Sequence, residues 1–82
     1  MNPELSRHVM AIASDIFNVP LAALSLTSSP ETVERWDSVQ HLSFVLALEE
    51  AFHIEVSPEN IEQIRNLGDA VTLVQAKTGA GR

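Results

Sequence analysis

The first part of the chain has hydrophobic residues at spacings of three and four. These positions are Leu5, Val9, Ile12, Ala13 and Ile16. Such spacing is typical of one face of an α-helix. Pro3 suits the first helical position and Asn2 is a candidate N-cap, whereas Asn18 and Pro20 interrupt the pattern. The sequence therefore predicts a first helix over residues 3–17.

The segment from residue 18 to residue 36 shows no helical or strand period. Ser28, Ser29 and Pro30 are turn-forming residues, so they predict a long connection rather than another regular element. The segment also contains hydrophobic residues at Leu21, Leu24 and Leu26. We expect these leucines to insert into the core. A loop of this length in a compact domain is often functional.

The next segment predicts a second helix that begins at Asp37 or Ser38, each a good N-cap, and ends near Phe52. Its apolar residues cover an arc of roughly 220° when each residue advances about 100° around the axis. In angular order they are Phe44, Leu48, Phe52, Val45, Leu42, Leu46 and Val39. One core-facing stripe needs only about half of this arc, so part of it is expected to remain outside the core.

The two edges of this arc have different expected roles. The edge formed by Phe44, Leu48 and Phe52 can face the core. The other edge consists of Val39, Leu42 and Leu46, with Glu49 and Glu50 beside it. An apolar helix edge left outside a small core is a candidate docking surface. The alternative is that neighbouring elements bury both edges and that the two acids form a solvated face.

Two further helices, the first of them short, are predicted near the end of the chain. Ser57 and Pro58 are suited to the start of a short helix. Asn66 is a candidate cap for a last helix. Residues 78–82 are rich in glycine and are expected to form a flexible tail. The apolar positions of these helices are Ile61, Ile64, Leu67, Ala70, Val71 and Val74. The pattern predicts an all-α, four-helix bundle with three main helices, one short helix and a long first loop, forming a single domain over residues 1–82.

Composition narrows the possible partners. The chain has 5 Lys and Arg residues against 11 Asp and Glu residues, a net charge of -6. Such a charge disfavours nucleic acid and anionic membranes and favours a basic protein partner. The absence of cysteine excludes disulfides and thiolate metal ligands and fits a cytoplasmic protein. No apolar run is long enough to span a membrane.

Ser38 has several interpretations when taken without its neighbours. It can be an ordinary N-cap, or it can carry a phosphodiester, which the positive end of a helix would stabilise. As a nucleophile with His41 as its base it would need a third orienting group and an oxyanion hole. We expect His41 to be a hydrogen-bonded structural residue. His8, His41 and His53 lack the spacing of metal ligands, so no metal site is expected.

The sequence Asp37-Ser38-Val39, followed at the right distance by ALEEAF over residues 47–52, resembles acyl carrier proteins. Their family pattern has an Asp-Ser-Leu site at the start of a helix that ends in a run such as A-L-E-E-x-F. The order of a first helix, a long loop, a serine-led helix, a short helix and a last helix extends the resemblance over nearly the whole chain.

The resemblance implies that Ser38 receives phosphopantetheine from coenzyme A through a separate, magnesium-dependent phosphopantetheinyl transferase. The thiol of that arm would carry acyl groups as thioesters, so the protein would be a monomeric carrier and not an enzyme. Asp37 matches the acid that helps to engage the transferase. Acyl-loading and acyl-transferring enzymes with basic docking patches would contact the positions matching Val39, Leu42, Leu46, Glu49 and Glu50.

The sequence departs from the family pattern at positions that bear on which biosynthetic pathway the carrier would serve. Carriers of housekeeping fatty-acid synthesis usually have more acids in the first turns of this helix, where Gln40, His41 and Ser43 stand here. With Trp36 before the Asp-Ser pair and His41-Leu42 after it, the chain looks more like stand-alone carriers from specialised bacterial pathways, which points to a specialised lipid, polyketide or similar pathway. The Gly-Gly-x-Ser pattern of many peptidyl carriers is missing, which disfavours an aminoacyl cargo. An unmodified interaction domain with the carrier fold, or a carrier for an aminoacyl group, remains an alternative.

Overall fold

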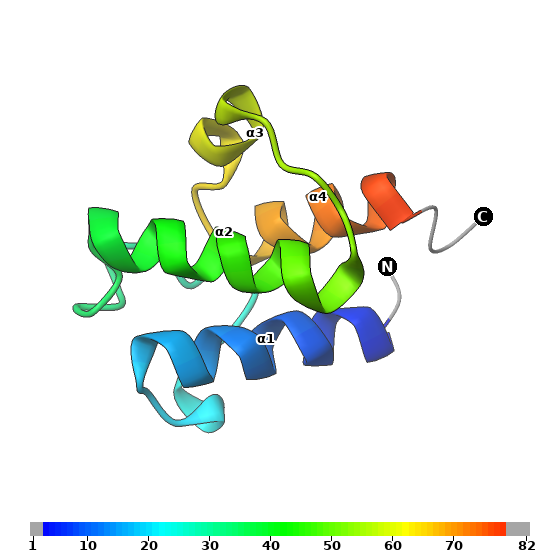
Figure 1. Cartoon of the computed structure of the whole chain (residues 1–82). Helices are drawn as coiled ribbons and strands as arrows, with labels where there is room; N and C mark the ends of the chain where they lie inside the picture. The colour runs from blue at the N-terminus through cyan, green and yellow to red at the C-terminus, as the bar shows by residue number, and fades with distance from the viewer. Residues whose placement is uncertain (1–2, 79–82) are drawn as a thin grey trace.

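The computed structural model describes residues 3–78, which form four α-helices and one short 3-10 turn (Figure 1). These elements are α1 (Pro3–Phe17), η1 (Leu21–Ala23), α2 (Ser38–Phe52), α3 (Pro58–Gln63) and α4 (Leu67–Thr78). Within this part of the chain there is no strand. The prediction of an all-α bundle with three main helices and one short helix is confirmed.

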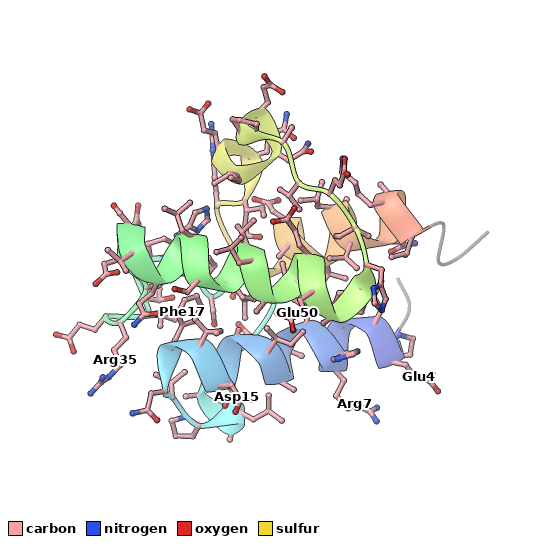
Figure 2. The ribbon with its side chains drawn as sticks, viewed as in Figure 1. Glu4, Arg7, Asp15, Phe17, Arg35 and Glu50 are labelled. Carbon is pink, nitrogen blue, oxygen red and sulfur yellow. The ribbon has the colours of Figure 1, made fainter. Side chains whose placement is uncertain are left out.

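Helices α1 and α2 run antiparallel and lie side by side, and α3 lies on the opposite side of α2 from α1 (Figure 1). Helix α4 packs against both α1 and α2. The core between these three helices includes Val9, Phe17, Phe44, Leu48 and Leu67, each with no exposed surface. Figure 2 shows Phe17 at the end of α1 nearest the start of α2. The core therefore extends to the end of α1 that lies nearest the start of α2.

The bounds of α1 agree with the prediction. Asn18 adopts a left-handed conformation with a φ of 54°, a conformation that asparagine tolerates better than most residues, and this ends the helix. The candidate cap at Asn2 lies outside the described residues. The expected flexible segment at residues 78–82 also lies outside them, except for Thr78, which is the last residue of α4.

Both edges of the apolar arc on α2 are placed as predicted. Phe44 and Leu48 are fully buried, and Phe52 packs partly buried against the core. At the other edge Val39, Leu42 and Leu46 are 71%, 51% and 64% exposed. The alternative in which neighbouring elements bury both edges is therefore wrong, because no described element covers the second edge.

The prediction that the leucines of the long loop insert into the core is wrong for two of them. Leu21 and Leu26 are exposed, and only Leu24 packs partly buried against the core. The core instead receives Val33 and Trp36. These two residues lie where the loop returns toward α2, whereas the leucines lie earlier, around η1 and the turns that follow it.

Backbone hydrogen bonds, rather than buried leucines, attach the long loop to α4. The carbonyl of Leu26 accepts a hydrogen bond from Gly68 N at 2.8 Å, and that of Ser28 accepts one from Leu67 N at 3.0 Å. A Cβ atom at residue 68 would lie 3.1 Å from the Leu26 oxygen, so glycine permits this close approach. The loop is thereby fixed at the start of α4 before it returns to α2.

Candidate functional site

Helix α2 is capped by Asp37 and not by Ser38. Asp37 has extended backbone angles, and its Oδ1 accepts a hydrogen bond from Gln40 N at 2.9 Å. Its carbonyl accepts the first helical hydrogen bond, from His41 N at 2.8 Å. These are the properties of an N-cap residue. The interpretation of Ser38 as an ordinary cap is therefore wrong, because the preceding residue already performs that role.

Ser38 is the first residue of α2, and its side chain is exposed. Among the described residues its hydroxyl has no hydrogen-bond partner. The first N–H groups of a helix have no intrahelical acceptor and form the positive end of its dipole. A phosphodiester on Ser38 would be stabilised by these groups. The position thus suits a covalently attached phosphate, and the hydroxyl is accessible to a modifying enzyme.

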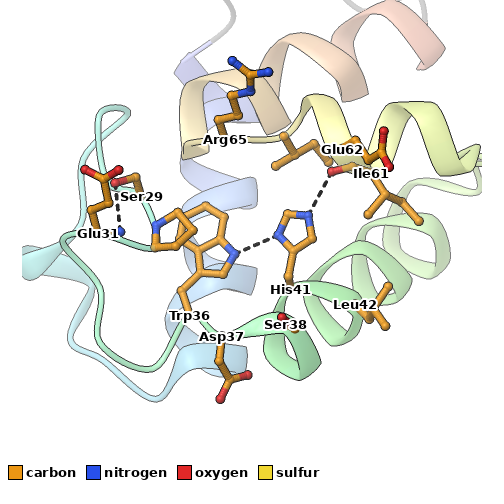
Figure 3. A pocket seen from close by; sticks show the side chains of 12 residues that line it. Ser29, Glu31, Trp36, Asp37, Ser38, His41, Leu42, Ile61, Glu62 and Arg65 are labelled. Atoms are coloured by element: carbon orange, nitrogen blue, oxygen red, sulfur yellow. Dashed lines mark hydrogen bonds between the residues drawn. The ribbon is translucent and has the colours of Figure 1, made fainter.

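A pocket of about 790 Å³ lies beside Ser38 (Figure 3). The long loop contributes Trp36 to its wall, α2 contributes His41 and Leu42, and α3 contributes Ile61. Ser38 lies at the edge where the loop enters α2. A group attached to Ser38 therefore has a partly apolar recess next to its point of attachment.

His41 makes hydrogen bonds with both ring nitrogens. Trp36 Nε1 donates to His41 Nδ1 at 2.8 Å, and His41 Nε2 lies 3.0 Å from the carbonyl oxygen of Ile61 (Figure 3). This confirms the expectation of a hydrogen-bonded structural histidine. Because neither nitrogen bonds to Ser38, the arrangement does not provide the serine–histidine pair that a hydrolase would need.

Aromatic packing fixes Trp36 just before the cap of α2. The Trp36 ring stacks on Phe17 with centroids 4.8 Å apart and meets the edge of Phe44 at 5.9 Å. Such pairs add to the stabilisation from apolar burial. Since Trp36 directly precedes Asp37, this cluster also fixes the position at which α2 and Ser38 begin.

The acids beside the exposed apolar edge differ in their surroundings. Glu49 is partly buried, and its Oε2 accepts a hydrogen bond from Val56 N at 3.0 Å. Glu50 is exposed. Glu49 therefore already holds the segment between α2 and α3, a role that its position in the ALEEAF run did not reveal. The partner-binding role of both acids stays a prediction.

The described residues also bear on metal binding and on membrane-spanning helices. Residues 3–78 contain no group of three or more His, Cys, Asp or Glu side chains placed to hold a metal ion. Over the same residues, no helix combines the length and apolar character needed to cross a membrane.

Comparison with known proteins identifies the family. Residues 7–74 match the family model described as the phosphopantetheine attachment site. An acyl carrier protein of Prochlorococcus marinus (strain MIT 9515) is 36% identical over 76 residues, which cover 93% of this chain and 95% of the relative. One from Picosynechococcus sp. is 31% identical over 80 residues, covering 98% and 99%. The chain therefore belongs to the acyl carrier protein family, whose members are carriers with a phosphopantetheine prosthetic group and not catalysts.

Proposed function

We propose that Ser38 carries the phosphopantetheine arm, and that acyl intermediates travel on the arm's thiol as thioesters. In the loading step Ser38 Oγ bonds to the phosphorus that bears pantetheine in coenzyme A. The pyrophosphate bond breaks, adenosine 3′,5′-bisphosphate leaves, and the hydroxyl proton is released. When bound, the arm supplies the thiol that a chain with no cysteine lacks. Asp37, adjacent to the serine, is proposed to engage the transferase.

The observation that carries this proposal is the exposed hydroxyl of Ser38 at the start of α2, which makes no hydrogen bond within residues 3–78. A serine that served as the cap would keep its oxygen engaged with the backbone. Here Asp37 makes the capping hydrogen bond, so modification of the Ser38 hydroxyl disrupts no hydrogen bond among the described residues. The pocket beside Ser38 supports the proposal further, since it offers space next to the attached group.

Loading of the wild-type chain is the first expected result. Incubation with coenzyme A, magnesium and a promiscuous phosphopantetheinyl transferase should raise the intact mass by one phosphopantetheine group per chain. Omission of coenzyme A is the control and should leave the mass unchanged. A folded chain that gains no mass would favour the alternative function, an unmodified interaction domain that keeps the carrier fold.

We further propose a specialised lipid or polyketide pathway rather than housekeeping fatty-acid synthesis. The first two turns of α2 contain Gln40, His41 and Ser43, none of them acidic. Fewer negative charges beside the attachment site weaken the attraction to strongly basic partner surfaces. The exposed acid on this helix, Glu50, lies near its far end. Charge complementarity with a partner is therefore expected to depend more on that end of α2.

The exposed edge of α2 is the proposed docking surface for acyl-loading and acyl-transferring enzymes. Val39, Leu42 and Leu46 follow Ser38 along one side of the helix and are all more than half exposed. Burial of such side chains at an interface supplies apolar contact, and nearby acids provide complementarity to a basic patch. Glu50, and the part of Glu49 that remains accessible, are the proposed acids. We expect the carrier to act as a monomer.

Leu46→Glu is expected to lower acyl loading by a partner enzyme about tenfold or more, which corresponds to about 1.4 kcal/mol of transition-state binding. The substitution places a charge where apolar contact is proposed. The free energy of unfolding should change by less than about 0.5 kcal/mol, because Leu46 contributes little to the core. The measurement is kcat/KM for loading of the phosphopantetheine-bearing carrier.

Leu21→Glu is the matched control. Leu21 is also an exposed leucine, 46% accessible, but it lies in η1 and not on α2. The Leu21→Glu substitution should leave kcat/KM for acyl loading unchanged. Equal effects of the two substitutions would indicate a general charge effect and would contradict a docking surface on α2.

A further inference from the structure

The wall of the pocket contains a hydrogen-bonded bridge that connects three segments of the chain. Its members are Trp36 of the long loop, His41 of α2 and Ile61 of α3. We propose that His41 is a positioning residue whose neutral imidazole holds α3 against the pocket beside Ser38, and whose protonation releases α3. The inference rests on the proposed function only in that the pocket adjoins the serine assigned to carry the arm.

The geometry fixes the protonation state that the bridge requires. The indole N–H of Trp36 can only donate a hydrogen bond, and it lies 2.8 Å from His41 Nδ1. Nδ1 must therefore be an acceptor without a proton. Nε2 then carries the proton of the neutral ring and donates it to the Ile61 carbonyl oxygen, 3.0 Å away. The two rings are also nearly parallel, with an interplanar angle of 20° and centroids 6.0 Å apart.

Helix α3 has few other attachments to α2. None of its residues, Pro58–Gln63, is buried, and Ile61 is the one that packs partly buried against the core. Among the described residues, His41 is the only side chain of α2 that hydrogen-bonds to α3. Glu49 holds the preceding segment through Val56. Loss of the His41 bond would thus leave the end of α3 nearest the pocket without its hydrogen bond to α2.

Protonation of His41 is incompatible with the bridge. In the imidazolium both nitrogens carry protons, so Nδ1 can no longer accept from the Trp36 N–H. Trp36 is only 2% exposed, and a buried donor without an acceptor is destabilising. We expect the ring to move away from this donor, and such a movement would also break its hydrogen bond to Ile61. One proton therefore breaks both halves of the bridge.

Charged groups line the pocket around His41. Glu31 from the loop, Asp37 at the start of α2 and Glu62 from α3 line the same pocket as His41, together with Arg65 after α3. The three carboxylates attract an imidazolium, and the guanidinium repels it. Three carboxylates against one guanidinium give this part of the pocket lining a net negative charge.

Trp36 fluorescence provides a direct test, since the chain has a single tryptophan. The emission of the chain, with and without its arm, is recorded from about pH 8 to about pH 5, the range in which histidine titrates. We expect a reversible transition while the helical circular dichroism signal is retained. The transition should persist without the arm, so failure of loading would not decide this test. A flat profile, or simultaneous loss of helix, would overturn the proposal.

His41→Gln separates the titration of His41 from other effects. The glutamine amide can accept a hydrogen bond from one neighbour and donate one to the other, but it does not titrate. The Trp36 emission of this variant should therefore be independent of pH. The control variants His8→Gln and His53→Gln should retain the wild-type transition. Persistence of the transition in His41→Gln, or its loss in either control, would overturn the assignment to His41.

Hydrogen exchange distinguishes release of α3 from a local change at Trp36. After correction for intrinsic exchange rates, protection of α3 amides should fall about tenfold from the neutral to the acidic state, while protection in α1 is unchanged. His41→Gln should show no such fall. Equal changes in α1 and α3, or none in α3, would contradict a bridge that positions α3.

Discussion

Ser38→Ala is expected to eliminate phosphopantetheine loading completely while leaving the helices folded. Alanine lacks the oxygen to which the phosphate would be attached. The wild-type hydroxyl is exposed and makes no hydrogen bond among the described residues, and Asp37 supplies the cap. The free energy of unfolding should therefore change by less than about 0.5 kcal/mol. Transfer from a fluorescent coenzyme A analogue, followed on a denaturing gel, measures loading.

Ser43→Ala is the matched control for this result. Ser43 lies on the same helix but is partly buried and further from its start. This variant should accept the fluorescent group as well as the wild type does. Labelling of Ser38→Ala, or loss of labelling in Ser43→Ala with the fold intact, would contradict the assignment of the attachment site to Ser38.

Phe44→Ala is expected to destabilise the fold by about 3–5 kcal/mol, the usual cost of removing a buried phenylalanine. Phe44 is fully buried and contacts Phe17 and Trp36, with ring centroids 5.4 Å and 5.9 Å away. Small domains have only about 5–15 kcal/mol of stability in total. Much of the population should therefore unfold at low urea concentration, as measured by circular dichroism.

Leu42→Ala tests whether the loss of stability in Phe44→Ala comes from the burial of Phe44, and not from shortening any apolar side chain of α2. Leu42 is 51% exposed and belongs to the proposed docking surface. Its replacement should lower the free energy of unfolding by less than about 1 kcal/mol, because a half-exposed side chain contributes less buried apolar area than Phe44 does. A loss equal to that of Phe44→Ala would mean that the two edges of α2 do not differ as described.

Local patterns predicted most of the fold because helix formation depends on neighbouring residues. The three-and-four spacing predicted the helix α1, Pro3 and Asn18 predicted its bounds, and Ser57 and Asn66 marked the starts of α3 and α4. The wide apolar arc of α2 predicted an exposed edge in addition to a buried one. This worked because the direction of each side chain on a regular helix follows from its position in the sequence.

The loop was predicted less well because it has no period from which to infer side-chain directions. Leu26 lies at the surface although it is apolar, and the loop is attached there through its backbone carbonyl, which accepts a hydrogen bond from Gly68 N. Trp36, near the end of the same loop, fills the core. Apolar character alone could not distinguish these two positions.

The details of the site depended on contacts that sequence spacing does not show. Asp37 and Ser38 are both good caps, and only the backbone geometry identifies Asp37 as the one that binds Gln40 N. The contact between His41 and Ile61 joins residues twenty positions apart. Glu49 likewise reaches Val56 across the end of α2. Such pairs arise from the packing of the helices and not from any local pattern.

The most direct test of the carrier assignment is to locate phosphopantetheine on the loaded chain by peptide mass spectrometry. Trypsin should release Trp36–Arg65 as one peptide, because it contains no internal Lys or Arg. Fragmentation must then distinguish Ser38 from Ser43 and Ser57 within this peptide. We predict a single phosphopantetheine group on Ser38. A group on any other residue, or no group on a folded chain treated with active transferase and coenzyme A, would contradict that assignment.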